Sequence, residues 1–270
     1  MMQKINEAVA YIQSLYQGTP AVGIVLGSGL GNFAAEIKAE KEIPYGDIPH
    51  FPVSTVEGHS GKLIFGELGG KKVVAMAGRF HFYEGYTMHE CVFPIRVMKF
   101  LGIKTLLLSN AAGGVNRKYK VGDLMIINDH ISQLTVNPLI GPNDKTMGPR
   151  FPDMTEPYKK HLIAKAKTIA AAANIKVQEG VYVAVTGPTF ETKAEYLMIE
   201  TLGGDAVGMS TVPECIVANH MGLDVFAMSV ITDVGIREEE NVITHEEVLE
   251  AAKHAEPNFT HIFKELVAAI

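Results

Sequence analysis

The sequence of 270 residues contains only two cysteines, Cys91 and Cys215, which are far apart and form no C-x-x-C pair. This scarcity excludes a disulfide-stapled scaffold and a thiolate zinc site, and it is typical of a reducing compartment. No apolar run approaches the roughly 18 to 20 residues that a membrane-spanning helix needs. The amphipathic N-terminus contains Glu7 and does not resemble a secretory signal. We therefore expect a cytoplasmic protein that does not bind a membrane.

The sequence also lacks a strong excess of one charge, and it lacks metal-binding motifs. The formal net charge is −6, which gives no reason to expect a nucleic-acid partner. Any anion must then be bound by a local cluster of donors. The ten histidines lack ligand spacing and no H-E-x-x-H motif occurs, so we expect no metal site. A serine nucleophile is not favoured either, because no G-x-S-x-G elbow is present.

Apolar residues make up 47% of the chain, enough for a sizeable core. Short β-branched runs alternate with longer amphipathic stretches, and no internal repeat occurs, which predicts one α/β domain over residues 1–270. Two runs flank Gly69-Gly70 and predict a hairpin, so we expect a twisted mixed β-sheet flanked by helices. The predicted strands are Ala21–Leu26, Leu63–Leu68, Val73–Ala77, Thr105–Ser109, Leu124–Asn128, Val181–Val185 and Val225–Ile231.

Three helices have clear signals. The first is Lys4–Gln17, which stops before Gly18, and the second follows Thr155 with a helical spacing of apolar residues. The third begins after Thr244, whose T-H-E-E string is a capping box and places His245 in the first turn. Residues 137–153 hold four prolines and two glycines, which predicts a long loop that is functional or contacts a partner.

Several segments could bind an anion. The turn Gly27-Ser28-Gly29-Leu30-Gly31 follows the first strand and offers backbone N–H groups and a hydroxyl, although it matches neither a P-loop nor a dinucleotide motif. A tight turn that merely needs glycine remains the alternative. Arg79 and His81 alternate with aromatic residues, so in an extended chain they point to one side and form an oxyanion clamp. His59, read alone, is more often structural.

Other polar residues follow later strands, where open α/β sheets bind ligands. Asn110 lies in the string Ser109–Gly114, after the strand Thr105–Ser109, and its amide can both donate and accept. A plain turn explains this string equally well. In the string Thr186–Thr192, Phe190 is suited to stacking on a planar ring and Glu191 to accepting hydrogen bonds from the edge of that ring. A helix-start role for Glu191 is the alternative.

Together these segments resemble the trimeric family of purine nucleoside phosphorylases over essentially the whole chain. The most specific strings are Phe51–His59, Gly78–His81, Asn110–Gly114 and Val207–Glu214. The resemblance implies a nucleoside phosphorylase fold, purine nucleoside and phosphate as partners, and reversible phosphorolysis of purine ribonucleosides and deoxyribonucleosides such as inosine and guanosine. The products would be the free base and (deoxy)ribose 1-phosphate, in purine salvage, with no cofactor besides the co-substrate phosphate.

The resemblance also implies residue roles. Phosphate would be bound by Ser28, His59, Arg79, His81, Ala111 and Ser210. The ribose would contact Tyr83, Met209 and His245, and Phe151 of a neighbouring subunit, which implies a homotrimer. The base would be surrounded by Phe190, Glu191, Thr232, Asp233 and Asn110. The residues expected to take part in catalysis are His81, Asn110, Glu191 and Asp233.

Asp233 departs from the pattern, because family members specific for 6-oxopurines usually have asparagine there and the methylthioadenosine branch has aspartate. An ionised Asp233 accepts hydrogen bonds and suits a 6-amino group, whereas a proton shared with Glu191 would let it donate to O6. We expect 6-oxopurine nucleosides to be preferred and adenosine to be cleaved measurably. The alternatives are a 5′-methylthioadenosine or adenosine phosphorylase, a nucleoside hydrolase and a non-catalytic purine-binding regulator.

Overall fold

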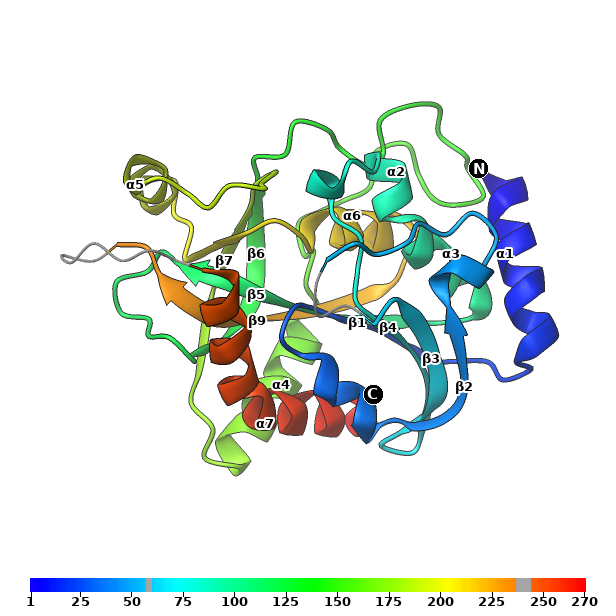
Figure 1. The fold of residues 1–270 in the computed structure, drawn as a ribbon, viewed down its shortest axis with the longest axis horizontal. Coiled ribbons are helices and arrows are strands. Elements are labelled where there is room, and N and C mark those ends of the chain that lie inside the picture. Colours follow the sequence, from blue (N-terminus) through cyan, green and yellow to red (C-terminus); the bar gives the residue numbers. More distant parts are fainter. Residues whose placement is uncertain (57–59, 237–243) are drawn as a thin grey trace.

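The structure is a computed structural model that describes residues 1–56, 60–236 and 244–270. Within these ranges one sheet has the strand order β2-β3-β4-β1-β5-β8-β7-β6-β9, and β5 also pairs with β9. Strands β5, β8, β7, β6 and β9 therefore close into a ring, from which β1 to β4 extend (Figure 1). The strands are β1 (Val22–Leu26), β2 (Lys38–Pro44), β3 (Lys62–Leu68), β4 (Lys71–Ala77), β5 (Thr105–Gly114), β6 (Leu124–Ser132), β7 (Val177–Ala184), β8 (Ala206–Gly208) and β9 (Asp224–Val234).

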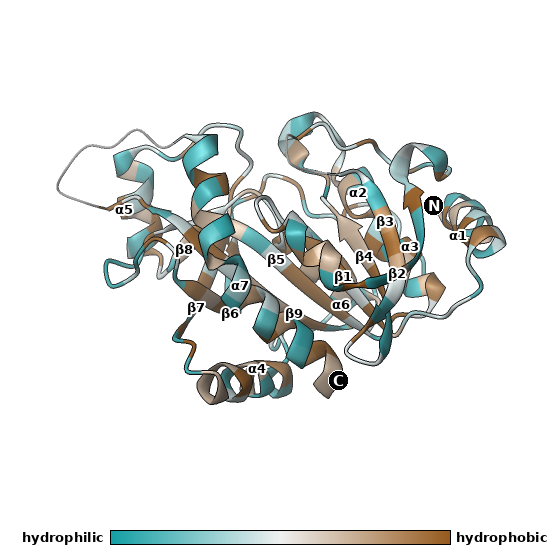
Figure 2. Cartoon of the chain, turned by 60° about the horizontal axis from the view of Figure 1, so that its bottom comes forward, coloured by the Kyte–Doolittle hydropathy of each residue, from teal (hydrophilic) through white to brown (hydrophobic). Residues whose placement is uncertain are grey.

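Helices cover the sheet on both sides. Figure 1 shows α2, α3 and α6 on one side and α4 and α7 on the other. The helices are α1 (Met2–Leu15), α2 (Met88–Cys91), α3 (Phe93–Leu101), α4 (Lys160–Ala172), α5 (Lys193–Thr201), α6 (Val212–His220) and α7 (His245–Ala269). Figure 2 shows the central strands as mostly hydrophobic, whereas the helices carry hydrophilic residues as well. The expected architecture, a mixed sheet flanked by helices, is confirmed.

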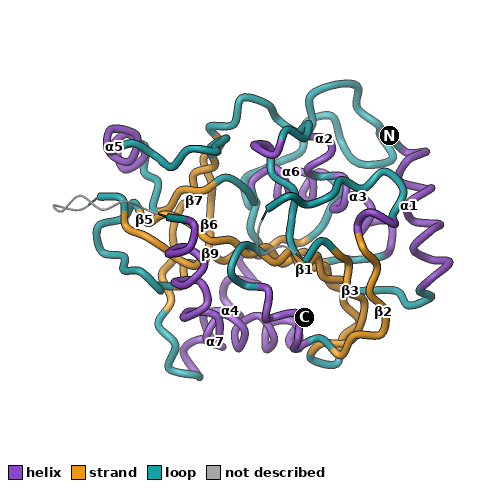
Figure 3. The backbone as a smooth tube through the Cα atoms, viewed as in Figure 1, coloured by secondary structure: helices purple, strands orange, loops and turns teal. Residues whose placement is uncertain are grey.

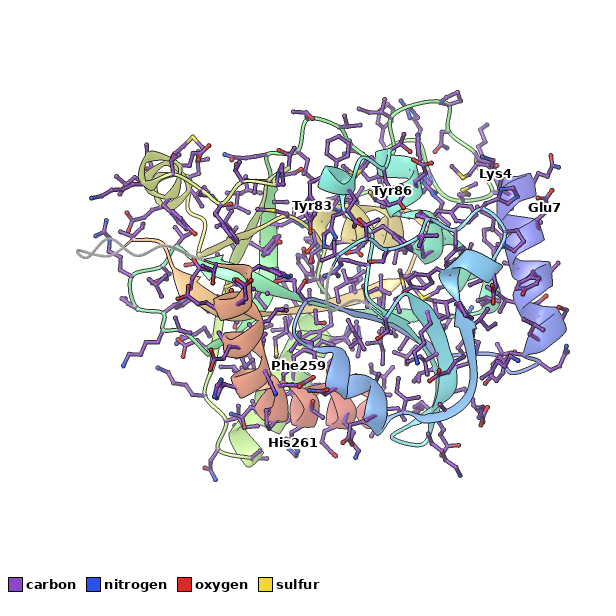
Figure 4. The ribbon with its side chains drawn as sticks, in the orientation of Figure 1. Lys4, Glu7, Tyr83, Tyr86, Phe259 and His261 are labelled. Carbon is purple, nitrogen blue, oxygen red and sulfur yellow. The ribbon has the colours of Figure 1, made fainter. Side chains whose placement is uncertain are left out.

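Core residues lie on both faces of the sheet, against α3 and α6 on one face and against α7 on the other. All five residues of β1 are buried, as expected for a strand with neighbours on both edges and helices on both faces. Phe259 of α7 (Figure 4) and Phe263 are completely buried, and their ring centroids lie 4.1 Å apart. A fully buried phenylalanine stabilises a fold by about 1.5–3 kcal/mol. This packing holds the C-terminal helix against the strands that carry the candidate site.

The hairpin prediction is confirmed in detail. Strands β3 and β4 are antiparallel, with Leu68 opposite Lys71 and only Gly69 and Gly70 between them. Both glycines have positive φ, 55° and 76°, as the two-residue turn that matches the twist of the strands requires. In contrast β1 runs parallel to β4 and β5, so the sheet is mixed.

Other boundaries differ from the prediction. Strand β5 continues to Gly114, because its second half pairs with both β8 and β9, so the string after Ser109 is strand rather than turn. Strand β9 likewise continues to Val234 and β6 to Ser132, whereas β7 begins at Val177 and ends at Ala184. The partners of a strand decide its length, and these partners are far away in the sequence.

Two strands and four helices are absent from the prediction. Strand β2 is rich in lysine and glutamate and mostly exposed, as expected for an edge strand, so it lacks an apolar pattern. Strand β8 has only three residues. Helices α2, α3, α5 and α6 have nine residues or fewer, which is too short for a clear periodicity. The first helix ends at Leu15, before the predicted Gln17, because Tyr16 is extended and packs its ring on Phe65.

The loop prediction and the C-terminal capping box are confirmed. Residues 133–159 contain neither helix nor strand, and this long loop connects β6 to α4 (Figure 3). At the start of α7 the Thr244 hydroxyl accepts from the Glu247 N–H at 3.3 Å, and the Glu247 carboxylate accepts from the Thr244 N–H at 3.2 Å. The cap fixes His245 as the first residue of the helix.

Candidate active site

A cavity of about 370 Å³ lies where β1, β4, β5, β8 and β9 end, and the first turn of α7 closes one side. This position is the usual ligand site of an open α/β sheet. The cavity brings together residues from eight separate segments. Its lining includes Ser28, Arg79, His81, Tyr83, Asn110, Ala111, Phe190, Glu191, Met209, Ser210, Thr232, Asp233 and His245. All of these were predicted as site residues.

The turn that presents Ser28 is packed from two sides. The Gly27 N–H donates to the Ser109 hydroxyl at 3.1 Å, and a Cβ at Gly27 would lie 2.7 Å from the Ser109 carbonyl oxygen. Gly29 has a φ of 76°, and its Cβ would lie 2.4 Å from Cβ of Ala252 in α7. The fold therefore requires glycine at both positions, as the tight-turn interpretation expects. The same turn also places Ser28 in the lining of the cavity, so the two interpretations are compatible.

Arg79 is held by a carboxylate that the sequence analysis did not assign. Its side chain is only 1% exposed, and Nε and Nη2 each donate to one oxygen of Glu214 at 3.0 Å. Nη1 donates to the Ser109 carbonyl and lies 3.4 Å from the Ser210 hydroxyl. The guanidinium is thus bidentate to Glu214 of α6, and its Nη1 atom lies near the Ser210 hydroxyl at the cavity. This bidentate ion pair fixes where the positive charge sits.

His81 is oriented by Glu84. Its Nδ1 lies 2.9 Å from Glu84 Oε1, which also accepts from the His81 backbone N–H at 2.8 Å. Burial lowers the pKa of His81 and outweighs the opposing effect of Glu84. Burial raises the pKa of Glu84, but hydrogen bonds from His81 and Thr55 outweigh it and hold that pKa at about 2. At neutral pH the pair is a neutral imidazole that donates through Nδ1 to a carboxylate, which leaves Nε2 as an acceptor.

Two carboxylates lie at the other end of the cavity. Asp233 of β9 is 8% exposed, and its Oδ2 accepts from the Tyr196 hydroxyl at 3.1 Å. Its Oδ1 lies 3.3 Å from the Thr232 hydroxyl. Burial raises the pKa of Glu191, and the charge of Asp233 acts in the same direction. Hydrogen bonds from Tyr196 and from its own backbone oppose this shift without cancelling it. This end of the cavity is therefore acidic.

Asn110 is oriented by a strained threonine. Its Nδ2 donates to the Thr211 hydroxyl at 2.8 Å, and Thr211 has a φ of 70°, which is rare for a β-branched residue and costs about 1–3 kcal/mol. The start of α6 stabilises this conformation, because the Thr211 N–H donates to Glu214 at 3.1 Å. The amide oxygen of Asn110 consequently faces the cavity.

Three buried polar atoms that line the cavity have no hydrogen-bond partner within the described ranges. They are Asn110 Oδ1, Glu191 Oε1 and His245 Nε2. A buried polar group without a partner costs about 1–3 kcal/mol, so such groups persist where a ligand satisfies them. The three atoms come from β5, the loop before α5 and the start of α7. They define a ligand that carries polar groups at well-separated points.

Comparison with known proteins identifies the family. The model of the phosphorylase superfamily matches residues 21–268. The chain is 51% identical to purine nucleoside phosphorylase 1 of Geobacillus stearothermophilus, over 97% of this chain and 96% of that protein. It is 50% identical to purine nucleoside phosphorylase 1 of Bacillus subtilis, over 99% of both chains. The chain belongs to the purine nucleoside phosphorylase family. The predicted enzyme class is therefore confirmed.

Solved structures of purine nucleoside phosphorylases show the same fold. The Schistosoma mansoni enzyme in complex with adenosine superimposes with a TM-score of 0.94 at 42% identity, covering 99% of this chain and 97% of that chain. A schistosome purine nucleoside phosphorylase in complex with hypoxanthine gives a TM-score of 0.93 at 42% identity, with the same coverage. Purine ligands of both the 6-amino and the 6-oxo type thus occur in structures of the family.

Of the predicted site residues, one falls outside the described ranges and another lies outside the lining of the cavity. His59 falls outside the described residues. Phe151 lies in the loop of residues 133–159 and is 86% exposed, with the Arg150 guanidinium 5.6 Å from the centre of its ring.

Sequence reasoning missed three residues that organise the phosphorylase pocket. Glu84 orients His81, Glu214 holds Arg79, and Tyr196 donates to Asp233. The spacing of Glu84, three residues after His81, was a usable signal, because a short turn brings these positions together. The other two pairs join segments 37 and 135 residues apart, and no local pattern predicts such contacts.

Among the described residues, no helix is long and apolar enough to cross a membrane. Groups of three or more side chains suited to holding a metal ion are likewise not found in the same ranges.

Proposed function

We propose that this cavity binds phosphate at the Arg79 end and a purine nucleoside with its base at the Glu191 end, and that it cleaves the bond between base and ribose. The proposal rests on the chemistry of the two ends. One end carries a fixed cation with hydroxyl and imidazole groups, as an anion requires, and the other carries hydrogen-bonding carboxylates, as the edge of a purine requires.

At the phosphate end, Ser28, Ser210 and the Nη1 corner of Arg79 donate, with Ala111 beside them. Glu84 holds the neutral ring of His81 through Nδ1. The other ring nitrogen, Nε2, then accepts from the O–H of a hydrogen phosphate. His59 remains a predicted phosphate ligand. The ion pair with Glu214 keeps the guanidinium in one orientation before phosphate binds, which lowers the cost of ordering the site.

In the ribose region, His245 Nε2 supplies a partner for the 5′-hydroxyl, while Met209 and Tyr83 pack against the sugar. A 5′-methylthio group would leave the buried Nε2 without a partner, at a cost of about 1–3 kcal/mol. This observation favours nucleosides over 5′-methylthioadenosine. Ribose and deoxyribose substrates both carry the 5′-hydroxyl.

During cleavage, positive charge develops on the ribose and negative charge on the departing purine. Phosphate stabilises the cation and then forms the new bond to C1′, which gives (deoxy)ribose 1-phosphate. Phe190 covers the base, and Asn110 Oδ1 together with Asp233 and the neighbouring Thr232 faces its N7 side. A protonated Asp233 delivers its proton to N7 as the bond to C1′ breaks, so the base leaves as a neutral molecule and the carboxylate is left ionised. No step needs a metal or a cofactor.

For the base we propose that 6-oxopurine nucleosides such as inosine and guanosine are preferred and that adenosine is a slower substrate. Glu191 accepts from the N1–H of hypoxanthine and guanine, and His245 follows the nucleoside branch. The test is a phosphorolysis assay of inosine, guanosine, adenosine and 5′-methylthioadenosine, each with and without phosphate. Base release that does not require phosphate, or a preference for 5′-methylthioadenosine, would contradict the proposal.

We also propose that the enzyme is a homotrimer in which Phe151 completes the ribose site of a neighbouring subunit. The exposed ring supports this arrangement. A Phe151→Ala chain mixed with a Glu191→Ala chain should regain activity after subunit exchange, because hybrid trimers contain some intact sites. Exchange verified by mass spectrometry without any recovery would exclude the shared site.

Two further predictions remain proposals. Residues 1–270 form one functional domain, and the membership of the described strands in one sheet supports this. A cytoplasmic location is supported by Cys91 and Cys215, which are both free and buried.

A further inference from the structure

The residue that links the two carboxylates of the base end is Tyr196. It reaches the cavity from α5, is 3% exposed, and donates its hydroxyl to Asp233 Oδ2 at 3.1 Å. The same hydroxyl interacts with the carboxylate of Glu191. Tyr196 therefore lies between two acidic side chains that come from different elements.

The fold makes room for this tyrosine at two glycines. A Cβ at Gly113 of β5 would lie 2.8 Å from the Tyr196 hydroxyl oxygen. A Cβ at Gly235, just after β9, would lie 2.1 Å from the tyrosine ring. Any larger residue at either position would displace the ring. Tyr196 is thus packed closely against the backbone of β5 and of the residue that follows β9.

The charges around this group favour one proton on the carboxylate pair. Burial and the charge of Asp233 raise the pKa of Glu191, and the nearby Glu195 adds to the effect. Burial and the same two carboxylates raise the pKa of Tyr196 far above its ordinary value, so the phenol stays protonated. His245 lines the same cavity, whereas Arg79 is paired with Glu214 at the far end. Two carboxylates that interact with each other in a largely buried site tend to share a proton.

We propose that one proton moves between Glu191 and Asp233 through the Tyr196 hydroxyl, and that its two positions let a single pocket recognise both 6-oxopurines and 6-aminopurines. This inference rests on the proposed function, because it concerns the base end of the same cavity.

Each position of the proton matches one class of base. With the proton on Asp233, ionised Glu191 accepts from N1–H and Asp233 donates to O6, which is the pattern of hypoxanthine and guanine. With the proton on Glu191, this residue donates to N1 and ionised Asp233 accepts from the 6-amino group, which is the pattern of adenine. The net charge of the pair is the same in both states, so neither base has to bring or remove a proton.

The hydroxyl can carry the proton because it donates and accepts at once. The O–H of Glu191 gives its proton to the Tyr196 oxygen while the tyrosine proton passes to Asp233, and the reverse transfer restores the first state. Tyr196 is neutral before and after, and no other reactant is consumed. The 3.1 Å contact favours the state with ionised Asp233, because the phenol donates to this carboxylate while Glu191 Oε1 has no partner in the described ranges.

The test is the ratio of kcat/KM for adenosine to that for inosine in Tyr196→Phe. The ring remains and only the hydroxyl is lost, so Asp233 loses one of the donors that stabilise its ionised form. We expect the ratio to fall about tenfold or more, mainly through adenosine. Tyr119→Phe is the matched control, because Tyr119 is also buried but donates to the Glu179 carbonyl away from the cavity. It should leave the ratio unchanged.

Glu191→Gln should move the ratio in the opposite direction. Glutamine cannot hold the shared proton, so Asp233 stays ionised and inosine loses its donor to O6. Activity will fall for both substrates, but the ratio should rise. An unchanged ratio in Tyr196→Phe, or an equal loss on both substrates, would overturn the role of Tyr196.

A measurement on the unmodified protein covers the case in which Tyr196→Phe does not fold. Calorimetric binding of adenine and of hypoxanthine, in buffers that differ in ionisation enthalpy, gives the number of protons exchanged with solvent. An internal transfer predicts the same number for both bases, and a difference approaching a full proton would overturn the proposal. The proposed function fails separately, if the unmodified protein shows no phosphate-dependent cleavage of any purine nucleoside.

Discussion

The two ends of the cavity differ in how their polar side chains are held. At the phosphate end the described side chains are oriented before a ligand arrives: Arg79 is paired with Glu214, and the neutral ring of His81 is held by Glu84. At the base end two carboxylates face one tyrosine hydroxyl, and polar atoms of Asn110 and Glu191 have no partner among the described residues. A phosphate group is the same in every turnover, so a rigid cradle suits it. A base that varies at position 6 is better served by groups whose proton can move.

The rigid end should be the more sensitive to truncation. Arg79→Ala removes the fixed cation and leaves Glu214 buried without its partner, so the loss in kcat/KM for phosphate should correspond to about 2–4 kcal/mol. Steady-state kinetics with phosphate as the varied substrate measure it. Circular dichroism controls for folding, and a folded variant with unchanged phosphate kinetics would remove Arg79 from the phosphate site.

The adaptable end should change its preference rather than its total activity. In Asp233→Asn the amide can donate to O6 permanently, so inosine should be cleaved as well or better. Adenosine should lose about 1.5–3 kcal/mol in kcat/KM, because its 6-amino group meets another donor. The ratio of the two substrates is followed against pH. A ratio unaffected by the substitution would show that residue 233 does not read position 6, and adenosine as the preferred substrate of the unmodified protein would reverse the proposed specificity.

Between the two ends, His245 should contribute less. His245→Ala removes one neutral hydrogen bond, so kcat/KM for inosine should fall by about 0.5–1.5 kcal/mol. The loss on 5′-deoxyinosine should be much smaller, since this substrate lacks the hydroxyl. Equal losses on both nucleosides would mean that His245 serves only to start α7.

The smallest effect concerns stability in acid. The pKa of Glu84 is held at about 2, below its ordinary value of 4.5, so the folded state gains stability that is present above pH 4.5 and lost as the pH falls toward 2. In Glu84→Gln this part of the acid loss should be absent, and Tm should depend less steeply on pH over that window. Glu42→Gln is the control, because Glu42 forms an exposed ion pair with Lys62. Parallel Tm profiles for Glu84→Gln and the unmodified protein would contradict the assignment.

The sequence by itself determined the class of fold and most of the site. Period-two and helical patterns predict elements that bury one face, so the hairpin at Gly69-Gly70, the long loop and the cap at Thr244 follow from local chemistry. The motifs at strand ends, with the family resemblance, placed nearly every predicted residue in the cavity. Local rules succeed here because turns, caps and glycine-rich loops depend on neighbours in the chain.

The tertiary structure decided how those residues work together. Strands β5 and β9 extend beyond their apolar runs because distant strands supply their hydrogen bonds, and this carries Asn110 and Asp233 within strands rather than in turns. The partners Glu214 and Tyr196 come from helices too short to predict, and they meet Arg79 and Asp233 only after the chain has folded. Pairing across such separations depends on how whole elements pack, and packing is a property of the complete chain rather than of any local pattern.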